Sequence, residues 1–122
     1  MKLEINSLRP FIGAKDFNIS RAFYSDLGFA ETVISHDLSL FTVDQFNFYL
    51  QKYYQKDWIE NTMLFLEVQD VELTYQQLAA LQLDKKYEGV KLIPIRKESW
   101  GQECFMLDPA GVLLHFGNFI TK

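Results

Sequence analysis

The 122-residue chain has the length of one typical domain, and the sequence predicts a single domain over residues 1–122. Apolar residues make up 48% of the chain and charged residues 23%, which excludes a disordered protein. The formal net charge of −4 argues against a nucleic-acid partner, because phosphates require a basic face.

The chain shows no targeting or membrane signal. Residues 1–10 lack the apolar core of a signal peptide, and no run approaches the roughly 18 apolar residues of a membrane span. Cys104 is the only cysteine and cannot form an intramolecular disulfide, which fits a reducing compartment. We therefore expect a cytoplasmic protein without a membrane partner.

An amphipathic helix is predicted early in the chain. Asp16 is placed as its N-cap, because a carboxylate accepts from the free amides of the first turn, and Gly28 supplies the C-terminal stop. Apolar residues recur every four positions from Ile19 to Leu27, so we expect them on the buried face. The polar residues between them, Ser20 included, are expected to face solvent.

Strand-like runs surround this helix. They lie at residues 8–14, 30–35, 39–43 and 46–53. In the last run Asn47, Tyr49 and Gln51 alternate with apolar residues, which places all three on one face of the strand. The polar stretch 55–61 is predicted to connect this half of the chain to the next.

The same pattern then begins again. Asp70 follows Asp16 by 54 positions, and the same offset lays Leu73 on Ile19. A strand precedes the second helix, which ends near Gln82, and three strands follow it. These strands are predicted at 63–68, 90–95, 103–107 and 112–119, with a tight turn at 108–111. Each half is therefore a βαβββ unit, with repeat 1 at about residues 5–55 and repeat 2 at about 62–120.

A sheet with a single helix has only one covered face, so two such units gain stability by sharing their open faces. The predicted fold is α+β: two βαβββ repeats form an eight-stranded curved sheet, a half-open barrel. Its concave side is a cleft, and the helices lie outside.

Particular motifs add a family resemblance to this pattern. The first half contains Lys15-Asp16-Phe17, then Phe23-Tyr24, then Leu27-Gly28-Phe29, and the second half contains Trp100-Gly101 followed by Asp108-Pro109-Ala110-Gly111. Together they resemble the glyoxalase / bleomycin resistance / extradiol dioxygenase superfamily, also called vicinal oxygen chelate (VOC) proteins. The second set is similar to the close of the bleomycin-resistance branch.

The resemblance implies where a metal would bind in metal-dependent members: the first and last strands of each half. These positions fall on Arg9, on Tyr49 or Gln51, on Met63 or Leu64, and on His115. Arg9 is always protonated and cannot bind a metal, and only His115 is a usual ligand. One imidazole does not make a divalent site of three or four ligands. We therefore expect no metal and no other cofactor.

The same positions are candidates for ligand contact. His115 takes a cleft-facing position by resemblance, Arg9 suits an anionic or carbonyl group, and Trp100 suits stacking at the cleft mouth. Each also has a plain structural interpretation: a partly buried histidine, an ion pair with a glutamate, and core packing. The predicted ligand-binding residues are Arg9, Tyr49, Gln51, Trp58, Met63, Trp100 and His115. Trp58 and its neighbouring tyrosines suit either a cleft or a dimer contact.

The sequence favours a metal-free protein that binds a small organic molecule in an aromatic cleft. By resemblance it is a homodimer that sequesters an antibiotic in clefts shared by two subunits. Arg9 and the lack of an acidic cluster on the cleft strands favour a small neutral or anionic ligand over cationic bleomycin. One alternative is a lyase, isomerase or dioxygenase-like enzyme with an atypical metal site or with His115 as base. Another is an interaction module with a filled cleft.

Overall fold

The computed structural model describes residues 1–120 and confirms the two βαβββ units. The first half contains β1 (Phe11–Gly13), α1 (Phe17–Leu27), β2 (Ala30–Ser35), β3 (Leu38–Val43) and β4 (Phe46–Gln51). The second contains α2 (Lys56–Glu60), β5 (Met63–Glu67), α3 (Val71–Leu81), α4 (Leu83–Lys86), β6 (Lys91–Glu98), β7 (Gly101–Leu107) and β8 (Leu113–Phe119). No helix in this part of the chain has the length and apolar character to cross a bilayer.

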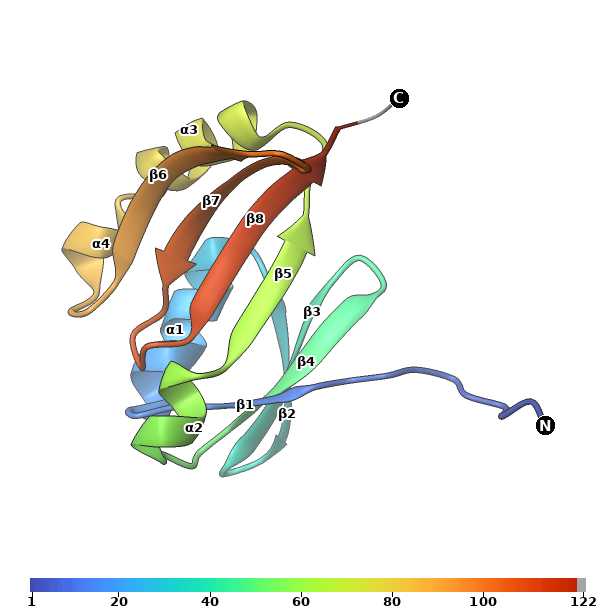
Figure 1. Cartoon of the computed structure of the whole chain (residues 1–122). Coiled ribbons are helices and arrows are strands. Elements are labelled where there is room, and N and C mark those ends of the chain that lie inside the picture. The colour runs from blue at the N-terminus through green and yellow to red at the C-terminus, as the bar shows by residue number, and fades with distance from the viewer. Residues whose placement is uncertain (121–122) are drawn as a thin grey trace.

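The eight strands form two equivalent four-stranded sheets. Their strand orders are β1-β4-β3-β2 and β5-β8-β7-β6, and in each sheet the edge strand that opens the half pairs parallel to the strand that closes it. Figure 1 shows the two curved sheets one above the other, with α3 and α4 over the outer face of the second sheet. The α+β fold with its helices outside is therefore confirmed.

The two long helices begin in the same way. The Asp16 carboxylate accepts from the Ile19 amide at 3.1 Å, and the Asp70 carboxylate accepts from the Leu73 amide at 3.1 Å. Both predicted N-caps are thus confirmed. Gly28 ends α1 with a φ of +117°, a left-handed conformation that favours glycine.

The predicted orientation of α1 is wrong in one respect. Ile19 is exposed, whereas Ser20 is completely buried. The helix is turned so that the large rings of Phe17, Phe23 and Tyr24 face the core, and these aromatic side chains bury more apolar area than Ile19 would. The prediction from four-residue spacing treated Ile19, Phe23 and Leu27 alike, and therefore placed the buried face of the helix too close to Ile19.

Several boundaries also differ from the predicted ones. β1 spans Phe11–Gly13 rather than residues 8–14, since only these three residues pair with β4. The stretch expected to be a plain connector contains α2, whose first turn is capped by the Gln55 side chain accepting from the Trp58 amide at 3.0 Å. α4 follows α3 directly.

A buried polar contact joins the two halves. Tyr24 of α1 donates its hydroxyl to Asp108 Oδ2 at 2.7 Å, although the two residues are 84 positions apart. The other carboxylate oxygen of Asp108 accepts from the amides of Ala110, Gly111 and Val112 at 2.8–2.9 Å, which forms the predicted turn. Burial raises the pKa of Asp108, and these four hydrogen bonds oppose that effect.

A second link between the halves lies near the surface. Asp26 of α1 accepts from Lys86 Nζ and from the Tyr87 hydroxyl, both at 2.5 Å. These two hydrogen bonds lower the pKa of Asp26. The ring of Tyr87 also packs edge-on against Phe23, so α1 is held to the second half on two sides.

Removing the buried hydroxyl tests the importance of the first link. Tyr24→Phe leaves Asp108 Oδ2 buried without its donor, and we expect the free energy of unfolding to fall by about 1–3 kcal/mol. Urea denaturation followed by circular dichroism measures this change. The matched control, Tyr54→Phe, removes an exposed hydroxyl and should change stability by less than about 0.5 kcal/mol. Equal effects of the two variants would contradict a structural role for the Tyr24–Asp108 hydrogen bond.

Candidate functional site

Each sheet has one covered and one open face. Side chains alternate between the faces along a strand, and residues directly opposite each other on neighbouring strands share a face. Phe65 lies opposite His115, which lies opposite Phe105. The residues on either side of His115 along β8, Leu114 and Phe116, belong to the buried core instead. The row through Phe65 therefore lies on the face away from the core.

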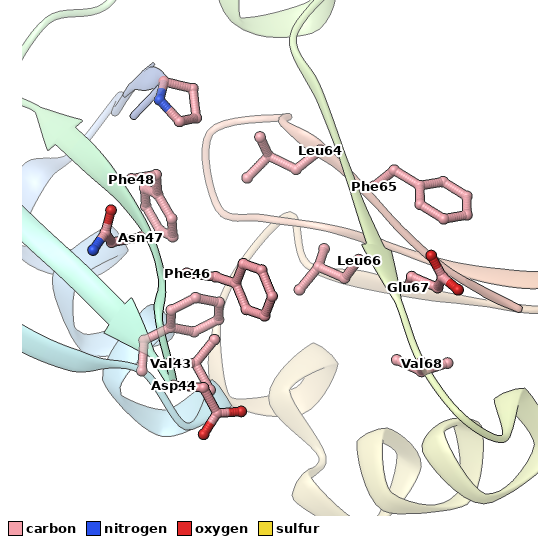
Figure 2. Close-up of a pocket in the computed structure, with 12 residues that line it drawn as sticks. Val43, Asp44, Phe46, Asn47, Phe48, Leu64, Phe65, Leu66, Glu67 and Val68 are labelled. Atoms are coloured by element: carbon pink, nitrogen blue, oxygen red, sulfur yellow. The ribbon is translucent and has the colours of Figure 1, made fainter. Parts of the chain in front are cut away.

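An apolar cavity of about 600 Å³ lies between the two sheets, at the β3–β4 turn and β5. Figure 2 shows Leu64 and Leu66 of β5 pointing toward Phe46, whereas Phe65 and Glu67 point away to the opposite side of β5. None of the seven predicted ligand-binding residues lines this cavity. The predicted residues belong to other surfaces.

Three aromatic side chains gather on the open face of the second sheet. We call Phe65, Trp100 and Phe119 the aromatic cluster. Their ring centroids are 6.1 Å (Phe65–Trp100), 5.8 Å (Phe65–Phe119) and 5.3 Å (Trp100–Phe119) apart. Phe65 is 46% exposed and Phe119 is 50% exposed, so their rings remain accessible to a ligand. Exposed aromatic side chains that gather in one place offer an apolar surface for binding.

Gly117 makes room for the cluster. A Cβ atom at this position would lie 2.7 Å from Cζ of Phe65, which is closer than real side chains approach. The ring of Phe65 therefore packs directly on the backbone of β8. Any larger residue at position 117 would displace it.

His115 and Glu103 form a polar pair beside the cluster. Nδ1 of His115 lies 2.8 Å from Oε1 of Glu103, a residue that is only 6% exposed. Nε2 of the same ring lies 3.4 Å from the sulfur of Met63. The imidazole is also 5.1 Å from the ring of Phe105 and 6.1 Å from that of Phe65, measured between centroids.

A basic residue flanks this pair without joining it. Arg96 lies opposite Glu103 in the strand register, but its Nε pairs with Glu98 at 2.9 Å. Its guanidinium also lies 5.3 Å from the ring centroid of Phe105. An ion pair thus lies on the same face as His115.

The first sheet carries a smaller group on its open face. Arg9 donates from Nη1 to the Tyr49 hydroxyl at 2.8 Å, and Tyr49 stacks on Phe11 with centroids 4.8 Å apart. Within residues 1–120 Arg9 forms no ion pair, so the alternative that Arg9 serves only to pair with a glutamate does not hold there. Gln51 lies two residues after Tyr49, at the end of β4.

The structure thus divides the predicted residues among three places. Met63, Trp100 and His115 lie together on the second sheet, and Arg9, Tyr49 and Gln51 belong to the first sheet. Trp58 lies in α2, where it packs on the core and its ring is 5.8 Å from that of Tyr53. A Cβ at Gly13 would lie 2.6 Å from the Trp58 ring, so Trp58 closes the end of β1.

Sequence reasoning missed four residues of this site. They are Phe65, Glu103, Phe105 and Phe119. Alternation along the strands was a usable signal, since Phe119 lies four residues after His115 on the same face. The pairing of β7 with β8, which brings Glu103 to His115, could not be read from spacing alone.

The four positions that the resemblance assigns to a metal do not fit a divalent ion. They hold a guanidinium, a phenol, a thioether and one imidazole, and the Arg9 guanidinium already donates to Tyr49. Among the described residues no group of three or more His, Cys, Asp or Glu side chains could hold a metal. The side chains at these positions therefore do not support chemistry on a bound metal.

No family model matches the chain, and no curated protein matches it. Solved structures do. A copper(II)-bleomycin complex of the bleomycin-binding protein from Streptomyces verticillus superposes with a TM-score of 0.80 at 20% identity, over 98% of this chain and 100% of that one. An antibiotic-binding protein from a Streptomyces species gives 0.73 at 15% identity, over 98% and 100%. Lactoylglutathione lyase from Agrobacterium tumefaciens gives 0.69 at 13% identity, over 94% and 95%.

These matches define the class of fold. The chain has the fold of the glyoxalase / bleomycin resistance / dioxygenase proteins, and the resemblance predicted from its motifs is confirmed at that level. Proteins that bind antibiotics and enzymes both share this fold, so function has to be argued from the site.

Cys104 belongs to the covered face and not to the site. Its side chain is fully buried, and burial raises the pKa of the thiol from 9.0 to about 11. Because the thiolate is the reactive form, a rise of this size lowers its population at pH 8 by about a hundredfold. We therefore expect the native protein to react with Ellman's reagent at least about a hundredfold more slowly than the protein in 6 M guanidinium chloride. Rapid reaction of the native thiol would contradict this placement.

Proposed function

We propose that this protein binds a small aromatic molecule on the open face of its second sheet and sequesters it without chemical change. The observation that carries this proposal is the exposed aromatic cluster beside the His115–Glu103 pair. Ligand sites combine apolar and aromatic walls with a few placed polar groups, and this face offers both. The mechanism is stoichiometric capture, in which the cluster stacks on the ligand and His115 orients it.

The named functions of the structural neighbours support this class of function. Two of the neighbours are named for binding bleomycin or an antibiotic. Arg9 argues for a different ligand from bleomycin itself, because within residues 1–120 it pairs with no carboxylate and donates to the Tyr49 hydroxyl. We infer that the ligand is neutral or anionic and that capture takes place in the cytoplasm.

We further propose that the protein is a homodimer and that the second copy completes the site. Ligand pockets bury most of their ligand's surface, roughly 70–90%, and a single open sheet face does not. Exposed apolar side chains occur on the open faces of both sheets, including Phe11 on the first and the cluster on the second. In a symmetric dimer the first-sheet face of one copy can cover the second-sheet face of the other, twice. Arg9 and Tyr49 would then join His115 and Trp100.

A second candidate function is an enzyme of the same fold that uses His115 as a base. The specific observation in its favour is the 2.8 Å contact between Nδ1 and buried Glu103, because a carboxylate fixes the orientation of a basic imidazole. Turnover of an added compound would favour this reading, and unchanged recovery of the compound would favour capture. The accessible cluster weighs against an interaction module with a filled cleft.

The proposed site is tested by removing the cluster. We expect the double variant Phe65→Ser/Phe119→Ser to weaken the binding of 2-naphthol by at least about tenfold in isothermal titration calorimetry, because both stacking rings are lost. Leu73→Ser is the matched control, since it removes a similarly exposed apolar side chain from the outer helix α3.

The same samples test the dimer by sedimentation velocity. The expected species is a dimer. Absence of naphthol binding to the unmodified protein, or equal weakening by the Leu73 control, would contradict the proposed site. A monomer at all concentrations would contradict the shared cleft.

A further inference from the structure

The hydrogen-bonding state of His115 restricts the class of ligand, on the assumption that the proposed site binds an aromatic molecule. A carboxylate only accepts hydrogen bonds, so Glu103 pairs with a protonated Nδ1. In a neutral imidazole this assignment leaves a lone pair on Nε2. The buried position of Glu103, with 6% of its surface exposed, makes exchange of this partner for water unfavourable.

The outer nitrogen of His115 lacks a comparable partner. Nε2 lies 3.4 Å from Sδ of Met63, and a thioether sulfur only accepts, so in the neutral tautomer with its proton on Nδ1 this contact is not a hydrogen bond and the Nε2 lone pair has no donor there. Met63 is 61% exposed at the start of β5, and its unbranched side chain can swing away from the ring. An incoming donor therefore meets an available acceptor on the open face.

The position of Nε2 relative to the aromatic cluster sets the geometry of the ligand. The imidazole centroid is 6.1 Å from that of Phe65, which in turn packs with Trp100 and Phe119. A planar ring stacked on the cluster thus holds a ring substituent next to His115. The substituent that matches a lone pair is a hydrogen-bond donor.

The charged groups around His115 are largely paired with one another. The guanidinium of Arg96 is held over Phe105, on the same face as the imidazole. Glu67 is exposed at the far end of β5, and Glu98 is already paired with Arg96. Charge on this face therefore does not select the ligand, and the selection falls to the hydrogen bond at Nε2.

We propose that the site selects hydroxy-substituted aromatic compounds, of the phenol and naphthol class, whose O–H donates to Nε2 of His115. The proton stays on the ligand oxygen, so no bond is broken. Glu103 acts as a positioning residue that fixes which nitrogen of the ring accepts. The ether of the same ring system lacks the donor and is the natural comparison.

The experiment compares 2-naphthol with 2-methoxynaphthalene at pH 8, where an imidazole is ordinarily neutral and naphthol keeps its proton. We expect calorimetry to show that the unmodified protein binds the naphthol roughly fivefold to tenfold more tightly, the value of about one net hydrogen bond. His115→Phe keeps a flat ring but removes the acceptor, so this preference should vanish. His36→Phe replaces the other histidine, which is exposed at the β2–β3 turn, and should leave the preference intact.

The outcomes separate this inference from the proposed function. Equal affinity of the unmodified protein for the two compounds would overturn the hydroxyl selection while leaving aromatic binding in place. Binding of neither compound would overturn both. A preference that survives in His115→Phe would assign the acceptor to another residue and overturn the inference.

A second variant and a direct spectrum cover the case of poor folding. His115→Phe leaves Glu103 buried without its partner, so His115→Phe/Glu103→Gln is made alongside it to remove the unpaired charge. The ¹⁵N spectrum of the His115 ring in the unmodified protein should show a protonated Nδ1 and an unprotonated Nε2. On addition of 2-naphthol only the Nε2 signal should shift strongly. A protonated Nε2 in the free protein would contradict the proposal.

Discussion

The structure depends on one constraint, which is that each four-stranded sheet has a single long helix and therefore a single covered face. Core residues such as Leu50 and Leu114 lie on the covered faces, and their strand neighbours Tyr49 and His115 lie on the open ones. The open faces are not solvated surfaces of the ordinary kind, because they carry exposed aromatic rings. The candidate site follows directly from this division.

Holding the two halves together is the task of a few polar contacts within an apolar core. The Tyr24–Asp108 hydrogen bond ties α1 to the turn before β8, the strand that carries His115. A buried carboxylate with four donors specifies one arrangement of these elements, since any other would leave it unpaired. The geometry of the site therefore rests on a contact outside it. The same contact joins Tyr24 of the first motif to Asp108 of the second.

Most of the fold could be predicted from the sequence because its signals are local. The helix caps at Asp16 and Asp70, the stop at Gly28 and the offset between the halves each depend on neighbouring residues. The site could be predicted only in part. His115, Met63 and Trp100 were found through resemblance to a family position, but Glu103 reaches His115 through strand pairing, and the ring of Phe65 needs the space left by Gly117. Such contacts arise from register between strands, which short sequence patterns do not encode.

The central claim is that the aromatic cluster is a binding surface and not merely exposed apolar area. The most direct test uses Trp58→Phe, in which Trp100 is the only tryptophan. Its fluorescence is titrated with nitrobenzyl alcohol, an aromatic quencher, and separately with acrylamide. The account predicts saturable quenching by the aromatic compound at concentrations where acrylamide has little effect. Quenching that rises linearly with both compounds, in the ratio seen for free tryptophan, would contradict it.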